Sequence, residues 1–378
     1  MRIGIDYTAA INQSDGIGRF VRNISRALVE LDQDNEYLLV YNSPNPGRAV
    51  DAPRAANVST RQLRFGERAT NILWHRLHMP VPLDLLTGSI DLFHAPNFVL
   101  PPLRKAIGIL TVHDLAFLTH PECADARLRE YLEHAVPYSV AKADFITTDS
   151  ENTRNDVICL LDADPDRVFV VPCGVDASFH PSDDAEVDAV RRQYGFLQPF
   201  ILVVGVIEPR KNLPRFIDAF ARFKVRTGAV HQLVIVGGNG WLVEDTFHQA
   251  EQSPFRSDIH FTGHVSDEVL RALYSATELF AYPALYEGFG IPVLEAMACG
   301  APVACANTSS LAEFASDAAL LFDPEDADSI ADSLEEACAS ESLRDDLRSR
   351  GLKRASDYQW SNAASRLLEV YTVAAKAR

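Results

Sequence analysis

Short runs of apolar, strand-forming residues alternate with helix-forming segments from one end of the chain to the other, and this alternation restricts the fold more than any other feature. Strands that alternate with helices form a parallel sheet with helices on both faces. The predicted strands span residues 3–6, 37–41, 90–94, 107–112, 145–148 and 168–171 in the first half, and 200–204, 233–236, 259–261, 279–282, 303–306 and 319–322 in the second.

The alternation is interrupted once, by a segment that has the composition of a linker. Pro172, Pro181 and the polar residues 182–186 separate the two series of strands. A chain of 378 residues is also more typical of two domains than of one or three. We therefore predict an α/β protein with two Rossmann-like parallel-sheet domains facing a central cleft. The predicted parts are residues 1–178, residues 179–359 and a C-terminal helix within residues 360–378.

The charge composition restricts the class of partner. The chain has 35 Lys and Arg residues against 52 Asp and Glu residues, which gives a formal net charge of −17. Binding to a nucleic-acid backbone needs a basic face, so nucleic acid is not expected as a partner. A small phosphate ligand needs only a few local cations and is compatible with this composition.

The cysteines and the N-terminus indicate the compartment. The six cysteines form no C-x-x-C pair and lie mostly in apolar contexts, which predicts buried free thiols in a reducing compartment. The chain opens on a predicted strand, and no apolar run is long enough to cross a bilayer. We expect a cytoplasmic protein without a transmembrane segment, any membrane contact being peripheral and at the inner face.

Parallel sheets bind ligands at the carboxyl ends of their strands, so functional residues are expected directly after the strands. Gly16 and Gly18 follow the first predicted strand and precede the first predicted helix. Glycines at this place let backbone N–H groups approach an anion at a helix N-terminus. A plain flexible turn is the alternative, because G-x-G alone is not a full phosphate-binding motif.

One histidine also directly follows a predicted strand. His113 and Asp114 come directly after the strand predicted at residues 107–112, so His113 is expected to point into the cleft. The alternative is a hydrogen-bonded histidine with a structural role. His75 and His78 lie on a helical segment and are interpreted as structural or surface residues. No set of His, Cys or carboxylate residues has the spacing of a metal site, so no metal is expected.

Two adjacent cations follow the first strand of the second domain. Arg210 and Lys211 come after Gly205 and precede a helix that starts near Asn212. Cations normally favour the opposite end of a helix. Their position therefore indicates a bound anion such as a diphosphate, because Arg can bind two oxygens and Lys supplies a point charge. A solvated basic turn is the alternative.

The most specific segment spans residues 286–300. Glu287 follows a predicted strand and turn, and Gly288 and Gly290 allow the backbone to approach a ligand. Glu295 lies about one turn into an otherwise apolar helix, where a carboxylate needs a partner. The two hydroxyls of a ribose would satisfy it. The alternative is a helix cap together with one exposed glutamate.

These segments together resemble the group-one glycosyltransferases, a large retaining family with the GT-B fold. Glu287 and Glu295 match its E-x7-E motif, and His113 and Asp114 match its N-domain histidine motif. Residues 205–212 match its glycine and R-K-N element. The matches follow the family's order over nearly the whole chain, with further landmarks at residues 171–176, 233–238 and 261–263.

The resemblance implies a catalytic set of four residues. Arg210 and Lys211 would bind the donor diphosphate and stabilise charge on the leaving nucleotide. Glu287 would hold the donor sugar, and His113 would contact the sugar and line the acceptor side. Breaking the sugar–phosphate bond develops negative charge on the diphosphate, and fixed cations are the main way to stabilise it.

The resemblance also implies a wider donor site. Glu295 would hold the ribose, the backbone near Val265 would read the base, and Gly16 and Gly18 would close over the phosphates or the incoming acceptor. The last helix would cross back to the N-terminal domain. The implied donor-binding residues are Gly16, Gly18, Gly205, Arg210, Lys211, Val265, Glu287, Gly288, Phe289, Gly290, Ile291, Val293 and Glu295.

The implied reaction is retaining transfer of a hexose from a nucleotide-diphosphate sugar, by same-face attack and without metal or cofactor. The acceptor would be a glycan, a lipid-linked glycan or a small molecule in cell-surface polysaccharide or glycoconjugate synthesis. Residues 112–115 followed by Pro121 and Glu122 resemble the branch with O-antigen and mannosyl transferases, which favours GDP-mannose as donor. The alternatives are a UDP-sugar transferase, a nucleotide-sugar epimerase of the same fold, and a non-catalytic nucleotide-sugar binding protein.

Overall fold

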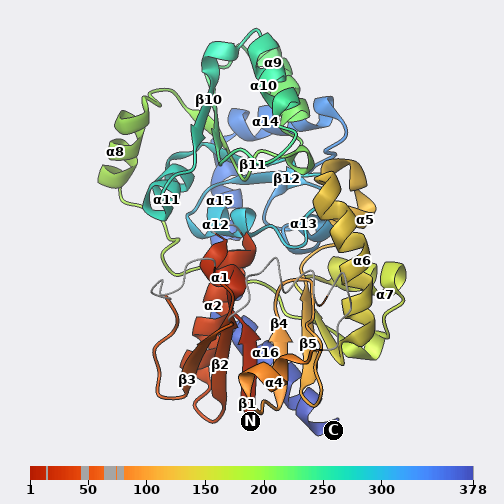
Figure 1. Ribbon diagram of the computed structural model, residues 1–378. Coiled ribbons are helices and arrows are strands. Elements are labelled where there is room, and N and C mark those ends of the chain that lie inside the picture. The colour runs from red at the N-terminus through yellow and green to blue at the C-terminus, as the bar shows by residue number, and fades with distance from the viewer. Residues whose placement is uncertain (14–15, 44–50, 64–73, 75–80, 378) are drawn as a thin grey trace. The chain divides into compact units, whose positions relative to one another are not determined.

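The computed structural model describes residues 1–13, 16–43, 51–63, 74 and 81–377, and the chain divides into two compact units. Each unit contains a parallel sheet with helices packed against it, which confirms the predicted fold class (Figure 1). His75 and His78 lie outside the described residues. Unit 1 comprises Met1–Leu115, Arg127–Gly174 and Trp360–Arg378, and unit 2 comprises Ala116–Ala126 and Val175–Gln359.

In the described part of unit 1, the strands pair in parallel in the order β3-β2-β1-β4-β5-β6-β7. They are β1 (Arg2–Asp6), β2 (Glu36–Tyr41), β3 (Val58–Gln62), β4 (Leu92–Ala95), β5 (Ile107–Val112), β6 (Phe145–Thr148) and β7 (Val168–Val170). All six strands predicted for this half are confirmed. The sequence analysis missed β3, which lies at an edge of the sheet and exposes its three central residues.

The last helix of the chain belongs to unit 1. It packs against α2, and the rings of Trp360 and Phe20 lie 5.7 Å apart. The Tyr371 hydroxyl is 2.8 Å from Nδ1 of His94, which lies on β4. These contacts join the C-terminal segment to the first strands of the sheet. The helices of this unit are α1 (Thr8–Asn12), α2 (Gly16–Leu31), α4 (Leu83–Thr87), α6 (Ala126–Lys142), α7 (Glu151–Leu161) and α16 (Trp360–Lys376).

In unit 2, whose residues are all described, the strand order is β10-β9-β8-β11-β12-β13, again in parallel. The strands are β8 (Phe200–Val204), β9 (Gln232–Val236), β10 (Ile259–Gly263), β11 (Leu279–Tyr282), β12 (Val303–Ala306) and β13 (Leu320–Phe322). All six predicted strands are confirmed. Every residue of β8 is buried, as expected for a central parallel strand covered on both faces.

Most helices of unit 2 follow one of its strands, and a short segment from earlier in the chain also belongs to this unit. Residues 116–126 pack within this unit, and the Trp241 indole Nε1 donates a 2.7 Å hydrogen bond to the Cys123 carbonyl. The helices are α5 (Ala116–Thr119), α8 (Asp184–Tyr194), α9 (Leu213–Thr227), α10 (Glu244–Gln252), α11 (Asp267–Ala276), α12 (Ile291–Ala298), α13 (Ser309–Phe314), α14 (Ala327–Ala339) and α15 (Glu341–Asp357). A 3₁₀ turn, η4 (Pro209–Lys211), precedes α9.

The cysteines are all free thiols, as predicted, but they are not all buried. Cys123, Cys173, Cys299 and Cys305 are buried, whereas Cys159 is exposed on α7. The prediction of burial is therefore wrong for Cys159, and Cys338 on α14 is of intermediate exposure. Among the described residues, no helix combines the length and the apolarity that a membrane span requires.

Candidate functional site

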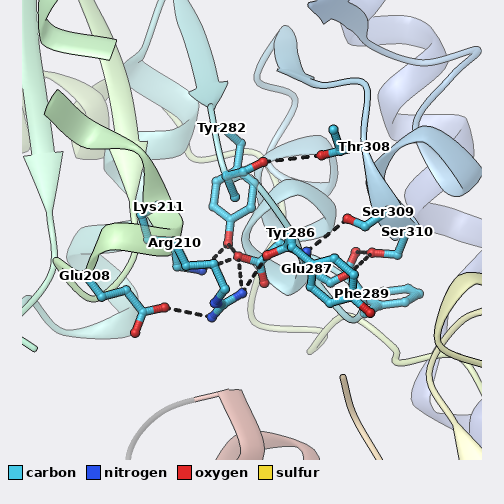
Figure 2. Close-up of polar contacts among 11 residues, drawn as sticks. Glu208, Arg210, Lys211, Tyr282, Tyr286, Glu287, Phe289, Thr308, Ser309 and Ser310 are labelled. Atoms are coloured by element: carbon cyan, nitrogen blue, oxygen red, sulfur yellow. Dashed lines mark hydrogen bonds and ion pairs between the residues drawn. The ribbon is translucent and has the colours of Figure 1, made fainter. Parts of the chain in front are cut away.

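Two neighbouring strands of unit 2 bring Arg210, Lys211 and Glu287 together. β8 and β11 pair in parallel, so their carboxyl ends lie at the same edge of the sheet. Lys211 and Arg210 lie on η4 after β8, and Glu287 lies in the loop after β11. Figure 2 shows their side chains directed toward one another. This placement follows from the strand order, because adjacent parallel strands present their loops side by side.

One oxygen of Glu287 accepts from three groups. The Lys211 Nζ lies 2.5 Å from Glu287 Oε1, Arg210 Nη1 lies 2.8 Å away, and the Tyr282 hydroxyl lies 3.1 Å away. Burial alone would raise the pKa of Glu287, but the charges of Arg210 and Lys211 outweigh burial and lower it to about 2. The carboxylate is therefore ionised and fixed at neutral pH.

A second carboxylate completes the cluster. Arg210 Nη2 donates to Glu208 Oε1 at 2.7 Å, and Arg210 Nη1 donates to the Tyr286 carbonyl at 2.8 Å. The Glu208 side chain is 4% exposed, against 18% for Arg210 and 11% for Lys211. Lys211 also donates to the Tyr282 hydroxyl at 2.7 Å. The two cations are thus held by two carboxylates and a phenol within one unit.

Serines at the start of α13 fix the backbone of the Glu287 loop. Ser310 Oγ lies 2.9 Å from both the Glu287 and Phe289 carbonyls, and the Glu287 N–H donates to Ser309 Oγ at 2.9 Å (Figure 2). Gly290 has φ +99°, and a Cβ there would lie 2.6 Å from Leu311 Cδ2. Only glycine fits this turn without strain.

The glycine after β8 makes room for a cation. Gly205 has φ +151°, and a Cβ there would lie 3.2 Å from the Cε of Lys211. The sequence analysis expected Gly205 in the donor site, and the structure places it against the lysine stem. Gly288 continues the loop that Ser309 and Ser310 hold.

α12 carries Glu295 and two other predicted residues into the interior. Ile291 opens the helix, Val293 is fully buried, and Glu295 is only 4% exposed. The Tyr274 hydroxyl of α11 donates to Glu295 Oε2 at 3.3 Å. The buried Glu295 therefore has a protein partner, and its expected contact with ribose hydroxyls stays a prediction. Phe289 stacks on Phe314 at 4.9 Å and has a packing role.

Gly16 and Gly18 occupy a different element from the one predicted. α1 lies between β1 and these glycines, and they form the first turn of α2 rather than a loop before the first helix. A Cβ on Gly18 would lie 2.1 Å from the Gln13 carbonyl oxygen. Close packing of α1 and α2 therefore requires Gly18. The remaining predicted residue, Val265, is buried between β10 and α11.

In unit 1, His113 follows β5 and is held from both ring nitrogens. Nδ1 lies 2.7 Å from Asp149 Oδ2, and Nε2 lies 2.8 Å from the Pro96 carbonyl. Because both partners are acceptors, the ring donates twice, as a charged imidazolium does. Burial alone would lower the pKa of His113. The negative charge and the hydrogen bond of Asp149 outweigh burial, together with the Pro96 hydrogen bond, and raise this pKa. Asp114 contributes in the same direction.

Sequence reasoning missed four residues that position the cluster. Tyr282 is the last residue of β11, Glu208 lies two positions before Arg210, and Ser309 and Ser310 follow β12. Tyr282 ends a predicted strand and the other three follow one, which was the available signal. What the sequence lacked was the pairing of Tyr282 with Lys211 and of the serines with the Glu287 loop, because these contacts join segments that are far apart in the chain.

Comparisons with known protein families divide the chain in the same two halves. Residues 188–354 match the model described as Glycosyl transferases group 1, and residues 14–179 match the model described as Glycosyltransferase Family 4. The second match covers the segment with His113, and the first covers Arg210, Lys211 and both glutamates of the E-x7-E motif.

Individual relatives and structures agree with the family models. The chain is 33% identical over 281 residues to the O-antigen chain mannosyltransferase B of Escherichia coli, which covers 74% of each chain. It is 31% identical over 270 residues to the serotype-specific mannosyltransferase WbdA of E. coli, covering 70% of this chain and 33% of that longer protein. The structure of HepE from Anabaena in complex with UDP and glucose has a TM-score of 0.77 at 16% identity, over 99% of this chain and all of HepE. This likeness shows the GT-B fold.

Proposed function

Because the chain belongs to the group-one glycosyltransferase family, we propose that it transfers mannose from GDP-mannose to the glycan of a growing cell-surface polysaccharide. The observation that carries the transfer reaction is the cluster of the partly exposed cations Arg210 and Lys211 with the buried Glu287. The choice of mannose and of polysaccharide rests on the two E. coli relatives, which are named as an O-antigen chain mannosyltransferase and a serotype-specific mannosyltransferase.

The proposed step breaks the bond between the anomeric carbon and the diphosphate. Negative charge develops on the departing GDP, where the Arg210 guanidinium and the Lys211 ammonium would neutralise it. These cations are held in place before the donor binds, because Glu208 and Glu287 already orient them. Charge stabilisation of this kind is most effective when the groups need no rearrangement during the reaction. We therefore propose that transfer needs no divalent metal and no cofactor.

We propose retention of the anomeric configuration by same-face attack of the acceptor hydroxyl. A two-step route would need a carboxylate nucleophile within reach of the sugar. Glu287 is a poor nucleophile, because Lys211, Arg210 and Tyr282 share its Oε1. We assign Glu287 and the backbone of residues 288–290 to the donor sugar, and Glu295 to the ribose hydroxyls.

The proposal also assigns roles to Gly205 and to the backbone near Val265. Gly205 gives the Lys211 stem its space, and the backbone near Val265 would contact the base. We assign acceptor recognition to unit 1, with His113 as its candidate contact residue. The acceptor is a glycan, free or lipid-linked.

The experiment is a donor screen with the purified full chain. GDP-mannose, UDP-glucose, ADP-glucose and dTDP-glucose are each incubated with a mannose-terminated oligosaccharide, with and without EDTA, and nucleoside diphosphate release is measured. We expect acceptor-dependent release from GDP-mannose, unchanged by EDTA, and an α-linked product by NMR. Faster turnover of UDP-glucose than of GDP-mannose would make UDP-glucose the donor. Conversion of the sugar nucleotide to its epimer without acceptor would indicate an epimerase, and binding without turnover would indicate a binding protein.

A further inference from the structure

Three side chains of different chemistry meet at the other end of the unit 2 sheet. A nitrogen of His231, a carboxylate oxygen of Glu278 and the sulfur of Cys338 all lie within 4.8 Å of one another. Imidazole, carboxylate and thiolate are the three ligand types that Zn²⁺ uses in proteins.

The sheet order brings these residues together. His231 directly precedes β9 and Glu278 directly precedes β11, and both strands pair with β8, one on each side. Cys338 is the penultimate residue of α14, which packs against β11. Arg210, Lys211 and Glu287 follow the carboxyl ends of β8 and β11. The cluster at the amino ends is therefore separate from the proposed transfer site.

The His231 imidazole is buried and poorly satisfied. The residue is only 9% exposed, Nδ1 has no hydrogen-bond partner, and Nε2 has only a 3.3 Å ion-pair contact with Glu278 Oε1. A buried polar atom without a partner is costly, so its retention needs a reason. The Lys224 ammonium holds the His231 carbonyl at 2.9 Å, and the Phe223 ring packs against the imidazole at 5.5 Å. The imidazole is thus well positioned.

The spacing fits a tetrahedral ion. His231 Nε2 lies 3.3 Å from Glu278 Oε1, outside hydrogen-bond geometry. Two ligands that each lie about 2.0–2.1 Å from a tetrahedral zinc are about 3.3 Å apart. An ion bound to both atoms would satisfy the imidazole without moving either side chain far.

We propose that His231, Glu278 and Cys338 bind one Zn²⁺ ion in a structural site of unit 2, with water as the fourth ligand. Binding forms a zinc–sulfur bond, and the proton of the Cys338 thiol leaves to solvent. The ion joins the starts of β9 and β11 to the end of α14. It stabilises unit 2 and takes no part in sugar transfer.

Arg344 provides the outer support that such a site needs. Its Nη1 lies 3.3 Å from Glu278 Oε1 and donates to the carbonyls of Ala337 and Cys338. Outer contacts of this kind orient the ligands of a metal. The Glu278 carboxylate and the Cys338 thiolate together neutralise the charge of Zn²⁺. The ion therefore does not repel the Arg344 guanidinium strongly.

The test is a zinc titration of the full chain after treatment with a chelator. The free Zn²⁺ concentration is set with a competing chromophoric chelator at pH 7.5, and three proteins are compared: the wild type, Cys338→Ser and Cys159→Ser. Cys159 is the control, because it is an exposed thiol of unit 1. We expect one Zn²⁺ per chain in the wild type and in Cys159→Ser, and an affinity lower by roughly 100-fold or more in Cys338→Ser.

Two further readouts guard against a variant that fails to fold. Co²⁺ in place of Zn²⁺ gives a thiolate-to-metal absorption band, which is expected in the wild type and Cys159→Ser and absent in Cys338→Ser. Circular dichroism checks that Cys338→Ser is folded, and Glu278→Gln is a second variant expected to lose affinity. Absence of stoichiometric zinc binding by the wild type, or equal affinity in the two cysteine variants, would overturn the site.

Discussion

Two buried charge clusters lie at the carboxyl ends of parallel strands, one in each unit, and they differ in construction. In unit 1, His113 and Asp149 form a single pair whose side chains are 9% and 6% exposed. In unit 2, Arg210 and Lys211 face Glu208 and Glu287, and the two cations are 18% and 11% exposed. The imidazole of His113 donates from both nitrogens to protein acceptors. Arg210 and Lys211 have long side chains whose charged groups each carry several hydrogen-bond donors. The first arrangement uses both donors of a buried ring, whereas the second keeps its two cations partly exposed.

Breaking the unit 1 pair should have the largest effect on stability. Asp149→Ala leaves the buried His113 without its counter-charge, and removing one partner of a buried pair costs about 3–5 kcal/mol. Urea unfolding at pH 7 measures the change. Asp218→Ala is the control, because Asp218 pairs with Arg222 at the surface and such pairs contribute less than about 1 kcal/mol. Equal losses in the two variants would mean that the His113 pair is no more than a surface-type contact.

Removing a unit 2 cation should instead lower turnover. Lys211→Ala deletes a charge aimed at the proposed leaving group, and the loss of one such donor costs roughly 10²–10³-fold in kcat. The free energy of unfolding should change less, because Arg210 still pairs with Glu287. The measurement is steady-state kinetics with GDP-mannose, with Lys353→Ala as an exposed lysine control in the same unit. A variant that keeps its kcat while its KM rises would show that Lys211 binds the donor without stabilising the transition state.

A second buried histidine of unit 1, His94, should make the stability of this unit depend on pH. Burial, and then the charge of His113, lower the pKa of His94 to about 3, so the folded unit keeps this ring neutral. The unfolded chain binds a proton near pH 6.5, and between these values it binds more protons than the folded chain. The stability that comes from the neutral His94 is therefore complete above pH 6.5 and is lost as pH falls toward 3. The loss is about 1.4 kcal/mol for each pH unit, so the free energy of unfolding falls by about 2 kcal/mol at pH 5.

His94→Gln tests this acid-side loss. The amide can still hydrogen-bond to Tyr371 or Thr111 but does not titrate, so the difference between urea midpoints at pH 7.5 and pH 5 should shrink. His113 acts on the other side, because its raised pKa contributes stability that is lost as pH rises. An unchanged pH dependence in His94→Gln would assign the acid loss to other groups that titrate between pH 7.5 and pH 5.

The strands could be predicted because the sequence signals burial on both faces. The runs at β8 and β11 contain only apolar residues, and each predicted strand of this kind is present. β3 was missed because Val58–Gln62 is polar and its place at the sheet edge needs no apolar run. The position of Gly16 and Gly18 was wrong because the short helix α1 has no apolar periodicity that separates it from a loop.

The site could be predicted only as far as chain order goes. Arg210, Lys211 and Glu287 were found because they follow strands, and open parallel sheets use those ends. Their partners Tyr282 and Ser310 depend on which strands are neighbours, whereas Glu208 lies only two positions before Arg210. The proposed zinc site has the same dependence on strand order, because the sheet brings His231, Glu278 and Cys338 together from distant positions in the chain.

The smallest expected effect concerns the loop that carries Glu287. Ser310→Ala removes a hydroxyl that lies 2.9 Å from two carbonyls of that loop and can donate to one at a time, and the net contribution of such a bond is about 1 kcal/mol. Glu287 keeps its cations, so kcat with GDP-mannose should fall by less than about 10-fold. The control is Ser356→Ala, an exposed serine on α15 whose hydroxyl donates to the Lys353 carbonyl. Wild-type kinetics in Ser310→Ala would mean that the cations alone position Glu287. A fall of about 100-fold, comparable to Lys211→Ala, would mean that the backbone of this loop contributes directly to binding the transition state, and the cluster of unit 2 would then extend from its side chains to its main chain.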